Sequence, residues 1–125
     1  MPGASSTSKT ARNRETMDVF DLKDLLKEHA DSGERSLRFM FRDALSMSLY
    51  ILPAGADDLQ QPHTEDEAYY VLGGNATWVV GDETRLVSEG AVIYVDRHIP
   101  HKFIDITEEL KLLAYFAPPY GSLAK

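Results

Sequence analysis

Two stretches of the sequence decide the fold: residues 61–74 read QPHTEDEAYYVLGG, and residues 90–103 read GAVIYVDRHIPHKF. Each stretch holds a run of aromatic and β-branched residues with glycine at one end and histidine toward the other. Such residues favour strands, and glycine favours the turns that join strands. Each stretch is therefore predicted to contain a strand with polar side chains beside one of its ends.

The same sequence pattern continues on both sides of these stretches: short apolar runs are separated by turns that contain glycine, aspartate or proline. Regular spacing of this kind predicts an all-β fold of about eight short strands, arranged as an antiparallel sandwich or barrel. The strands are expected at residues 37–41, 45–52, 68–72, 76–80, 85–87, 91–95, 102–106 and 110–116.

One short helix is expected before the first strand. Apolar residues recur at helical spacing between Val19 and His29, Asp18 can cap the start, and Ser32-Gly33 ends the run. Residues 1–15 are rich in serine, threonine and basic residues and are predicted to be a flexible arm. Residues 16–125 are predicted to form a single barrel domain, because the sequence shows no internal boundary.

Composition restricts the function further. The net charge of −7 disfavours a nucleic-acid partner, because affinity for phosphates depends on lysine and arginine. Cysteine is absent, which removes disulfides, thiolate metal sites and cysteine nucleophiles and fits a reducing cytoplasm. No apolar run is long enough for a membrane span or a signal-peptide core. We therefore expect a cytoplasmic protein whose partner is a small molecule, with no membrane or nucleic-acid partner.

Candidate chemistry gathers at the strand ends. His63 and His101 both lie beside turn residues, and Glu67 follows His63 at a distance of four positions. Two imidazoles and one carboxylate suit Fe(II), Mn(II), Ni(II), Co(II) or Zn(II), and they leave coordination positions open. The spacing alone is weak support for such a site.

The two quoted stretches together resemble the two sequence motifs of the cupin superfamily, in particular small, single-domain bacterial cupins of the RmlC-like type. Residues 75–89 separate the motifs, a short spacing typical of these proteins, and the resemblance spans roughly residues 45–118. The matching positions are His63, Glu67 and Gly74 in the first motif and Gly90, Pro100 and His101 in the second. The resemblance implies a double-stranded β-helix, or jelly-roll barrel, with one divalent first-row metal bound by His63, Glu67 and His101.

The sequence departs from the family pattern at two positions. Gln61 occupies the position of the first motif histidine, with Gln60 as the alternative if the register slips, and Asp96 replaces a usual proline. Because an amide oxygen is a poorer ligand than imidazole, Gln61 is expected to be a weak fourth ligand. The substitution Gln61→His is then expected to tighten metal binding.

Strand alternation predicts which side chains face the barrel interior: Tyr69 and Val71 with Glu67, and Phe103 and Asp105 with His101. The resulting pocket is expected to be aromatic with few polar groups. Its candidate walls are Trp78, Tyr50, Tyr94 and Phe39. Surface positions are expected for His98, His29, Glu65 and Asp66.

Cupin-like barrels support many reactions, so the resemblance leaves the activity open. The leading hypothesis is a metal-dependent enzyme that acts on a small organic molecule by dioxygenase, isomerase or lyase chemistry, with Glu67 and His101 as catalytic groups. A sensing or binding module without turnover is one alternative. Metal-free acid-base catalysis by Glu67 and His101, as in sugar epimerases, is the other. The resemblance also implies a homodimer, for which the β-rich residues 36–41 are the candidate contact.

Overall fold

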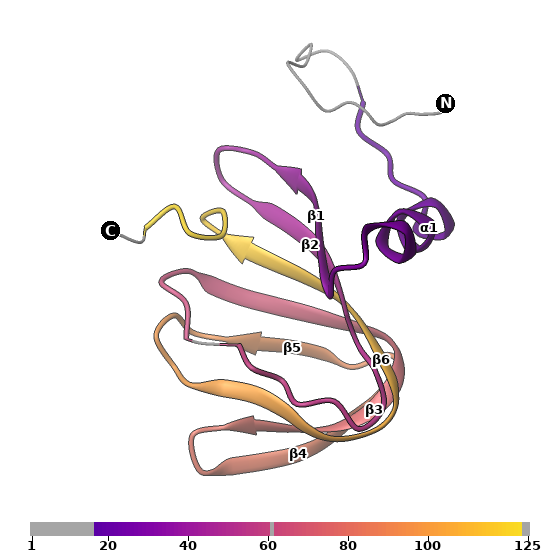
Figure 1. Ribbon diagram of the computed structural model, residues 1–125. Helices are drawn as coiled ribbons and strands as arrows, with labels where there is room; N and C mark the ends of the chain where they lie inside the picture. The colour runs from indigo at the N-terminus through magenta and orange to yellow at the C-terminus, as the bar shows by residue number, and fades with distance from the viewer. Residues whose placement is uncertain (1–16, 61, 124–125) are drawn as a thin grey trace.

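An antiparallel sheet that curls into a barrel, with one helix on its outside, makes up the fold (Figure 1). The computed structural model describes residues 17–60 and 62–123. In chain order the elements are α1 (Leu22–Ser32), β1 (Ser36–Phe41), β2 (Ser46–Leu52), β3 (Asp66–Val80), β4 (Glu83–Ser88), β5 (Val92–Val95) and β6 (His101–Ala117). The predicted all-β class with one short helix is confirmed.

The described strands form one six-stranded sheet in the order β1-β2-β6-β3-β4, with β5 paired to β3. The long strands β3 and β6 bend through the whole barrel and pair with each other along most of their length. The first part of β3 pairs with β5 and with the end of β6, and its second part pairs with β4 and the start of β6. This curl brings the two ends of β3 toward the same end of the barrel.

The described part of the chain has six strands where eight were expected, because two of the expected breaks between strands are bends within a strand. Gly73-Gly74 lies inside β3, and residues 107–109 lie inside β6. The pairing of β3 with β6 slips on both sides of Gly73, which marks a β-bulge. Gly74 has φ 97°, and a Cβ there would lie 2.2 Å from the Glu109 carbonyl oxygen. Glycine therefore permits a close crossing of two bent strands here rather than a reversal of the chain.

The helix begins at Leu22, three residues later than the sequence pattern predicts. Asp21, and not Asp18, occupies the N-cap position, and Gly33 ends the helix in the left-handed conformation as expected. Asp18 instead binds the Arg42 guanidinium, with 2.9 Å between Oδ2 and Nη2. Leu25 is buried against β2, so α1 covers the outer face of the sheet near β1 and β2.

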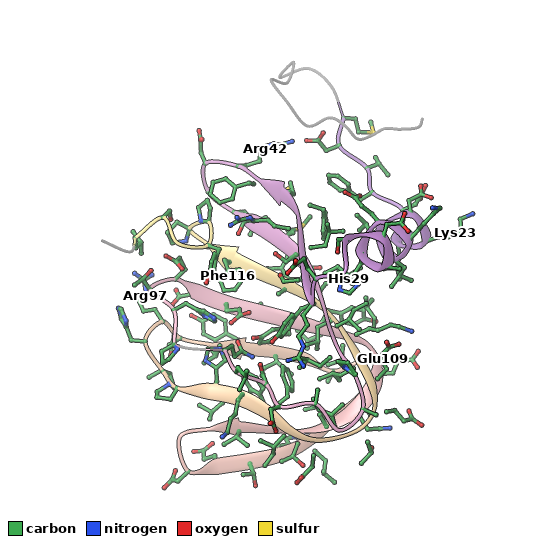
Figure 2. The ribbon with its side chains drawn as sticks, viewed as in Figure 1. Lys23, His29, Arg42, Arg97, Glu109 and Phe116 are labelled. Atoms are coloured by element: carbon green, nitrogen blue, oxygen red, sulfur yellow. The ribbon has the colours of Figure 1, made fainter. Side chains whose placement is uncertain are left out.

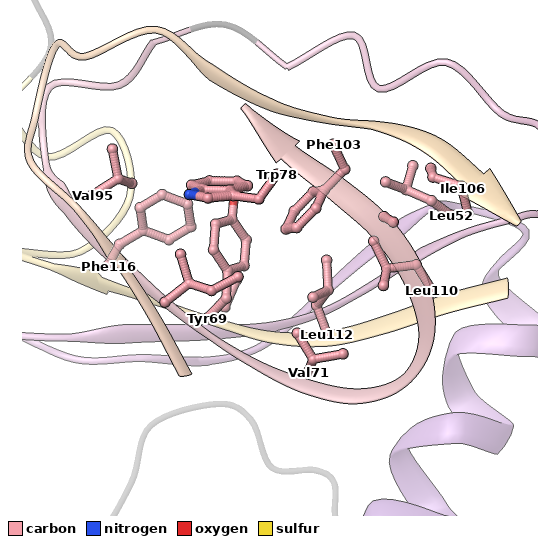
Figure 3. Packing of buried hydrophobic residues seen from close by; sticks show 13 residues of the cluster. Leu52, Tyr69, Val71, Trp78, Val95, Phe103, Ile106, Leu110, Leu112 and Phe116 are labelled. Atoms are coloured by element: carbon pink, nitrogen blue, oxygen red, sulfur yellow. The ribbon is translucent and has the colours of Figure 1, made fainter. Parts of the chain in front are cut away.

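The main core fills the inside of the barrel (Figure 3). Tyr69, Val71 and Phe103 are at most 1% exposed, which confirms the predicted alternation at these positions. Asp105 contradicts it: this residue is exposed and has φ 51°. The irregular backbone shifts the alternation by one, so Ile106 takes the buried position instead.

The loop between β2 and β3 joins the sheet through a buried carboxylate. Asp58 accepts hydrogen bonds from the Phe103 amide at 2.9 Å, the Tyr50 hydroxyl at 2.8 Å and the Gln60 amide nitrogen at 2.6 Å. This network attaches the loop to both β2 and β6.

Two further points concern the limits of the chain. The predicted arm at residues 1–15 lies outside the described residues. Within the described ranges, no helix has the length and apolar character needed to cross a membrane.

Candidate metal centre

Three side chains predicted from the sequence meet at one end of the barrel. His63 lies just before β3, Glu67 is the second residue of β3, and His101 is the first residue of β6. Glu67 pairs across the sheet with Val95 at the end of β5, and the turn at residues 96–100 then returns the chain to His101. The pairing of β5 with β3 therefore brings the two sequence motifs together.

The carboxylate of Glu67 is shared by the two imidazoles. Its Oε1 atom lies 3.2 Å from His63 Nδ1 and 3.2 Å from His101 Nε2. Taking one ligand atom from each of the three residues, all three atoms lie within 4.8 Å of one another. The three side chains are only 9%, 2% and 1% exposed for His63, Glu67 and His101. The three donor groups thus converge in a space largely closed to water.

A backbone contact fixes the orientation of the His101 imidazole, and a ring contact positions that of His63. His101 Nδ1 donates to the Ile99 carbonyl at 2.7 Å, which leaves Nε2 as the atom that faces Glu67. The His63 carbonyl accepts a 2.7 Å hydrogen bond from the His98 amide, and its ring packs edge-on against Phe116 at 4.9 Å. A backbone carbonyl on the far nitrogen of a histidine is the usual support for a metal ligand.

Burial and mutual contact set the protonation of the three groups. Burial, together with the nearby charge of His101, lowers the pKa of His63 to about 4, so this imidazole is neutral near pH 7. Burial raises the pKa of Glu67, although hydrogen bonding to His101 opposes the shift. Burial works to lower the pKa of His101, but hydrogen bonds to Glu67 and the Ile99 carbonyl prevail and raise it. His101 Nε2 and Glu67 Oε1 are joined by a hydrogen bond, whose proton a bound cation would displace.

The donor set fits a first-row divalent metal. Ligand atoms about 2.1 Å from one ion, at angles between tetrahedral and octahedral, lie about 3.0–3.4 Å apart. The two separations from Glu67 Oε1, 3.2 Å each, fall in this range, and all three ligand atoms lie within 4.8 Å of one another. Two nitrogens and one oxygen also match the preferences of Fe, Mn, Ni, Co and Zn.

The predicted fourth ligand, Gln61, lies outside the described residues. Its alternative, Gln60, has both amide atoms engaged elsewhere. Gln60 Nε2 donates to Asp58 at 2.6 Å, and Oε1 accepts from the Tyr69 hydroxyl at 3.0 Å. Gln60 therefore orders the wall beside the centre and leaves the three-residue donor set unchanged.

His98 follows the surface prediction, His29 follows it only in part, and one acidic residue contradicts it. His98 is exposed and has φ 66°, and His29, on the far side of the molecule, is half-buried with Nε2 2.8 Å from the Arg35 carbonyl (Figure 2). The prediction of a solvated Glu65 is wrong, because this residue is 1% exposed. Its Oε2 accepts from the Leu123 amide at 3.1 Å and contacts the Thr64 hydroxyl.

Asp66 keeps partial solvent access and binds Arg97 at the surface, with Arg97 Nη2 3.2 Å from Oδ2 (Figure 2). Neighbouring carboxylates thus have opposite surroundings. Glu65 is buried because it faces the turn at the C-terminal end of the described chain. This contact joins residues far apart in the sequence, so no local pattern around residues 65–66 could have predicted the burial.

A cavity of about 440 Å³ opens beside the three donor groups. It is lined by Ser36, Arg38, Ser48, Tyr50, Gln60, His63, Glu67, Tyr69, Ala114, Phe116 and Tyr120. Tyr50 is a wall residue as predicted, but the lining is more polar than expected. Ser36 and Arg38 of β1 and Ser48 of β2 supply that polarity; their alternate positions on paired strands were the sequence signal for a shared face.

The remaining predicted wall residues lie elsewhere. Trp78 is in the core with its ring centroid 5.4 Å from that of His101, so it supports the centre from behind. Phe39 packs with the residues beneath α1. Tyr94 is 59% exposed and binds Asp96 at 2.8 Å. Tyr94 pairs with Ala68 of β3 and faces the same side of the sheet as Ala68. That side is the outer one, because the flanking residues Glu67 and Tyr69 face inward.

Comparison with known proteins assigns the family. The family model described as the cupin domain matches residues 48–116, which is more than half of the chain. The chain belongs to the cupin family. An uncharacterised protein of Streptomyces coelicolor is 42% identical over 103 residues, which is 82% of this chain and 98% of that protein.

Solved structures agree on the barrel. An RmlC-like cupin from Shewanella frigidimarina superposes with a TM-score of 0.61 at 19% identity, over 66% of this cupin and 74% of that chain. Ectoine synthase from P. lautus superposes with a TM-score of 0.67 at 22% identity, over 82% of this cupin and 79% of that chain. The predicted cupin fold, a double-stranded β-helix of the RmlC-like type, is confirmed.

Proposed function

We propose that this cupin is a metal-dependent enzyme that binds one divalent first-row transition metal and acts on a small organic molecule. The observation that carries the proposal is the convergence of His63, Glu67 and His101, all nearly inaccessible to water, beside a cavity that His63 and Glu67 line. The cavity volume of about 440 Å³ suits a small ligand. The superposable ectoine synthase is an enzyme on the same fold.

The residues of this chain have distinct tasks in that proposal. His63 presents Nδ1, His101 presents Nε2 and Glu67 presents Oε1 to the ion. Phe116 and Tyr120 pack against the His63 ring and exclude water from that side. The bound metal supplies Lewis-acid polarisation of a substrate oxygen or activation of dioxygen. Three protein ligands leave further positions for substrate.

A second candidate is metal-free acid-base catalysis, favoured by the 3.2 Å contact between His101 Nε2 and Glu67 Oε1. The pKa of each group is raised, and a proton can pass between the two groups along this contact. Under this candidate a small molecule reacts directly with Glu67 and His101. Turnover by metal-stripped protein distinguishes it from the metal-dependent enzyme.

Calorimetric titration with Zn(II), Ni(II), Mn(II) and anaerobic Fe(II) tests the leading proposal. Wild-type protein should take up about one equivalent of at least one ion, and His63→Ala and His101→Ala should lose that uptake. His98→Ala is the matched control, because His98 is exposed and outside the donor group. Uptake that survives His101→Ala but is lost in His98→Ala would contradict the assigned site.

Turnover is tested on the metal-loaded protein by NMR of mixtures of small hydroxy, oxo and amino acids. Conversion that is lost in His101→Ala and retained in His98→Ala supports the enzyme. Binding of a mixture component without conversion of any bound compound favours the sensing module instead.

A further inference from the structure

Arg38 stands out among the residues that line the cavity, because it brings a positive charge to the same cavity that His63 and Glu67 of the metal centre line. It is the sole lysine or arginine among the lining residues of the described chain, and Glu67 is the sole carboxylate there. The protein as a whole carries a net charge of −7. A single positive charge in the cavity of an acidic protein suits a ligand that carries a negative charge.

Two partly exposed aromatic rings lie beside the guanidinium of Arg38, which is itself an exposed residue at the cavity. Its central carbon lies 5.1 Å from the ring centroid of Phe41 and 5.8 Å from that of Tyr120. Stacking on aromatic faces positions a guanidinium without using its N–H donors. The five donors of the fork therefore stay available for a planar anion.

Three other arginines of the described chain are bonded to oxygen, whereas Arg85 is exposed on β4, outside the cavity lining. Arg97 binds Asp66, Arg42 binds Asp18, and Arg35 donates to the Asp57 carbonyl at 2.8 Å. Within the described residues, neither an ion pair nor a side-chain hydrogen bond occupies the Arg38 guanidinium. Arg38 is thus oriented by packing, yet its hydrogen-bonding capacity is unused at the cavity.

The sheet places Arg38 in line with the metal-centre end of the cavity. Arg38 of β1 pairs with Ser48 of β2, Ser48 pairs with Ala114 of β6, and Ala114 pairs with Tyr69 of β3. Three steps of about 4.8 Å make this row roughly 14 Å long between backbones, and the inward side chains shorten the gap. Tyr120 connects the two ends directly, because its ring stands beside both Arg38 and His63.

We infer that Arg38 is the anion-binding group of the substrate pocket, and that the ligand is a small organic acid. Its carboxylate binds the Arg38 fork, its apolar or aromatic body lies against Phe116 and Tyr120, and its other end reaches the metal centre. The inference rests on the proposed function for the second contact only. The cation and the rings beside it do not depend on a metal.

Benzoate and its neutral analogue benzamide are suitable probes, because they share size and ring and differ in charge. Their dissociation constants are measured by ligand-observed NMR on the full chain, both metal-stripped and zinc-loaded. Wild-type protein should prefer benzoate by about tenfold or more in the metal-stripped form, as expected for charge-assisted bidentate hydrogen bonds. Arg38→Gln should remove this preference, and Arg38→Lys should keep only part of it, because lysine retains charge but not the fork.

Arg85→Gln is the matched control. It removes the same charge from an exposed position on β4, outside the cavity lining, and should leave the benzoate preference unchanged. Equal binding of benzoate and benzamide by the wild type, or a preference that survives Arg38→Gln, would overturn the inference. A change in oligomeric mass in Arg38→Gln with an unchanged preference would also overturn it, since Arg38 would then be a subunit contact.

Zinc uptake measured on the same samples separates this inference from the proposed function. About one equivalent of zinc together with a preference insensitive to Arg38→Gln overturns the anion site and leaves the metal centre standing. A preference that depends on Arg38, in a protein that takes up neither zinc nor Fe(II), Mn(II), Ni(II) or Co(II), supports the anion site and overturns the metal centre.

Discussion

At the scale of single residues, a buried carboxylate outside the donor set organises the wall beside it. Asp58 is 7% exposed and accepts from the Tyr50 hydroxyl, the Phe103 amide and the Gln60 side chain. Gln60 in turn accepts from the Tyr69 hydroxyl, two residues after Glu67. The loop before β3, two strands and the cavity wall therefore depend on one side chain.

Substitution of Asp58 by alanine should lower the free energy of unfolding by about 2–4 kcal/mol, because it leaves buried donors without an acceptor. Denaturant unfolding followed by circular dichroism measures the change. Asp57→Ala is the control: Asp57 is exposed, and its replacement should cost less than about 0.5 kcal/mol. Equal costs for the two variants would show that the Asp58 network contributes nothing to stability.

At the scale of elements, the bend of β3 is the feature that closes the barrel. Gly74 supports it with φ 97° and with a backbone approach that leaves no room for a side chain. Neighbouring Gly73 has open space where a Cβ would be placed. Two adjacent glycines in the first motif therefore have different requirements.

Gly74→Ala should destabilise the fold by about 3 kcal/mol or more, since a Cβ would clash with the Glu109 backbone in a strained conformation. Gly73→Ala should change stability by less than about 1 kcal/mol. Thermal unfolding of both variants provides the comparison. A Gly74→Ala protein as stable as Gly73→Ala would refute the close crossing of β3 and β6.

The same elements show what sequence can and cannot predict here. His63, Glu67 and His101 could be identified because two motifs and strand alternation are local patterns. The continuity of β3 through Gly73-Gly74 could not, because glycine pairs mark turns and bulges alike. The outward position of Asp105 could not be predicted, because an irregularity in the backbone reverses the alternation there. Arg38 could not be assigned to the pocket, because only strand pairing across the sheet brings it there.

At the scale of the whole molecule, the proposed metal links two distant motifs and so should stabilise the fold. An ion bound only by folded protein at a hundredfold excess over its Kd contributes about 2.7 kcal/mol. This corresponds to a rise in Tm on the order of 5 to 15 °C. Differential scanning calorimetry with and without chelator measures the increment, which His101→Ala should abolish and His98→Ala should retain.

The increment should also shrink as pH falls, beginning above the ordinary histidine pKa of about 6.5, because the pKa of His101 is raised. Ligating imidazoles must be unprotonated, and the raised pKa of His101 means that protons compete with the ion from that side. An increment that stays constant down to pH 5 would contradict ligation by His101.

Association of two chains stays a prediction from the family resemblance. The strand β1 is at one end of the strand order in the described sheet, so its outer edge is available for pairing with a second chain. Light scattering at micromolar concentration should give twice the chain mass of 14.0 kDa. The mass of a single chain at that concentration would contradict the homodimer.

Elemental analysis of protein purified without chelator tests the metal centre most directly. The geometry of His63, Glu67 and His101 predicts close to one equivalent of a first-row divalent metal per chain, lost on His63→Ala or His101→Ala and retained on His98→Ala. Protein that contains no such metal, and that takes up none when Fe(II), Mn(II), Ni(II), Co(II) or Zn(II) is added, would contradict it.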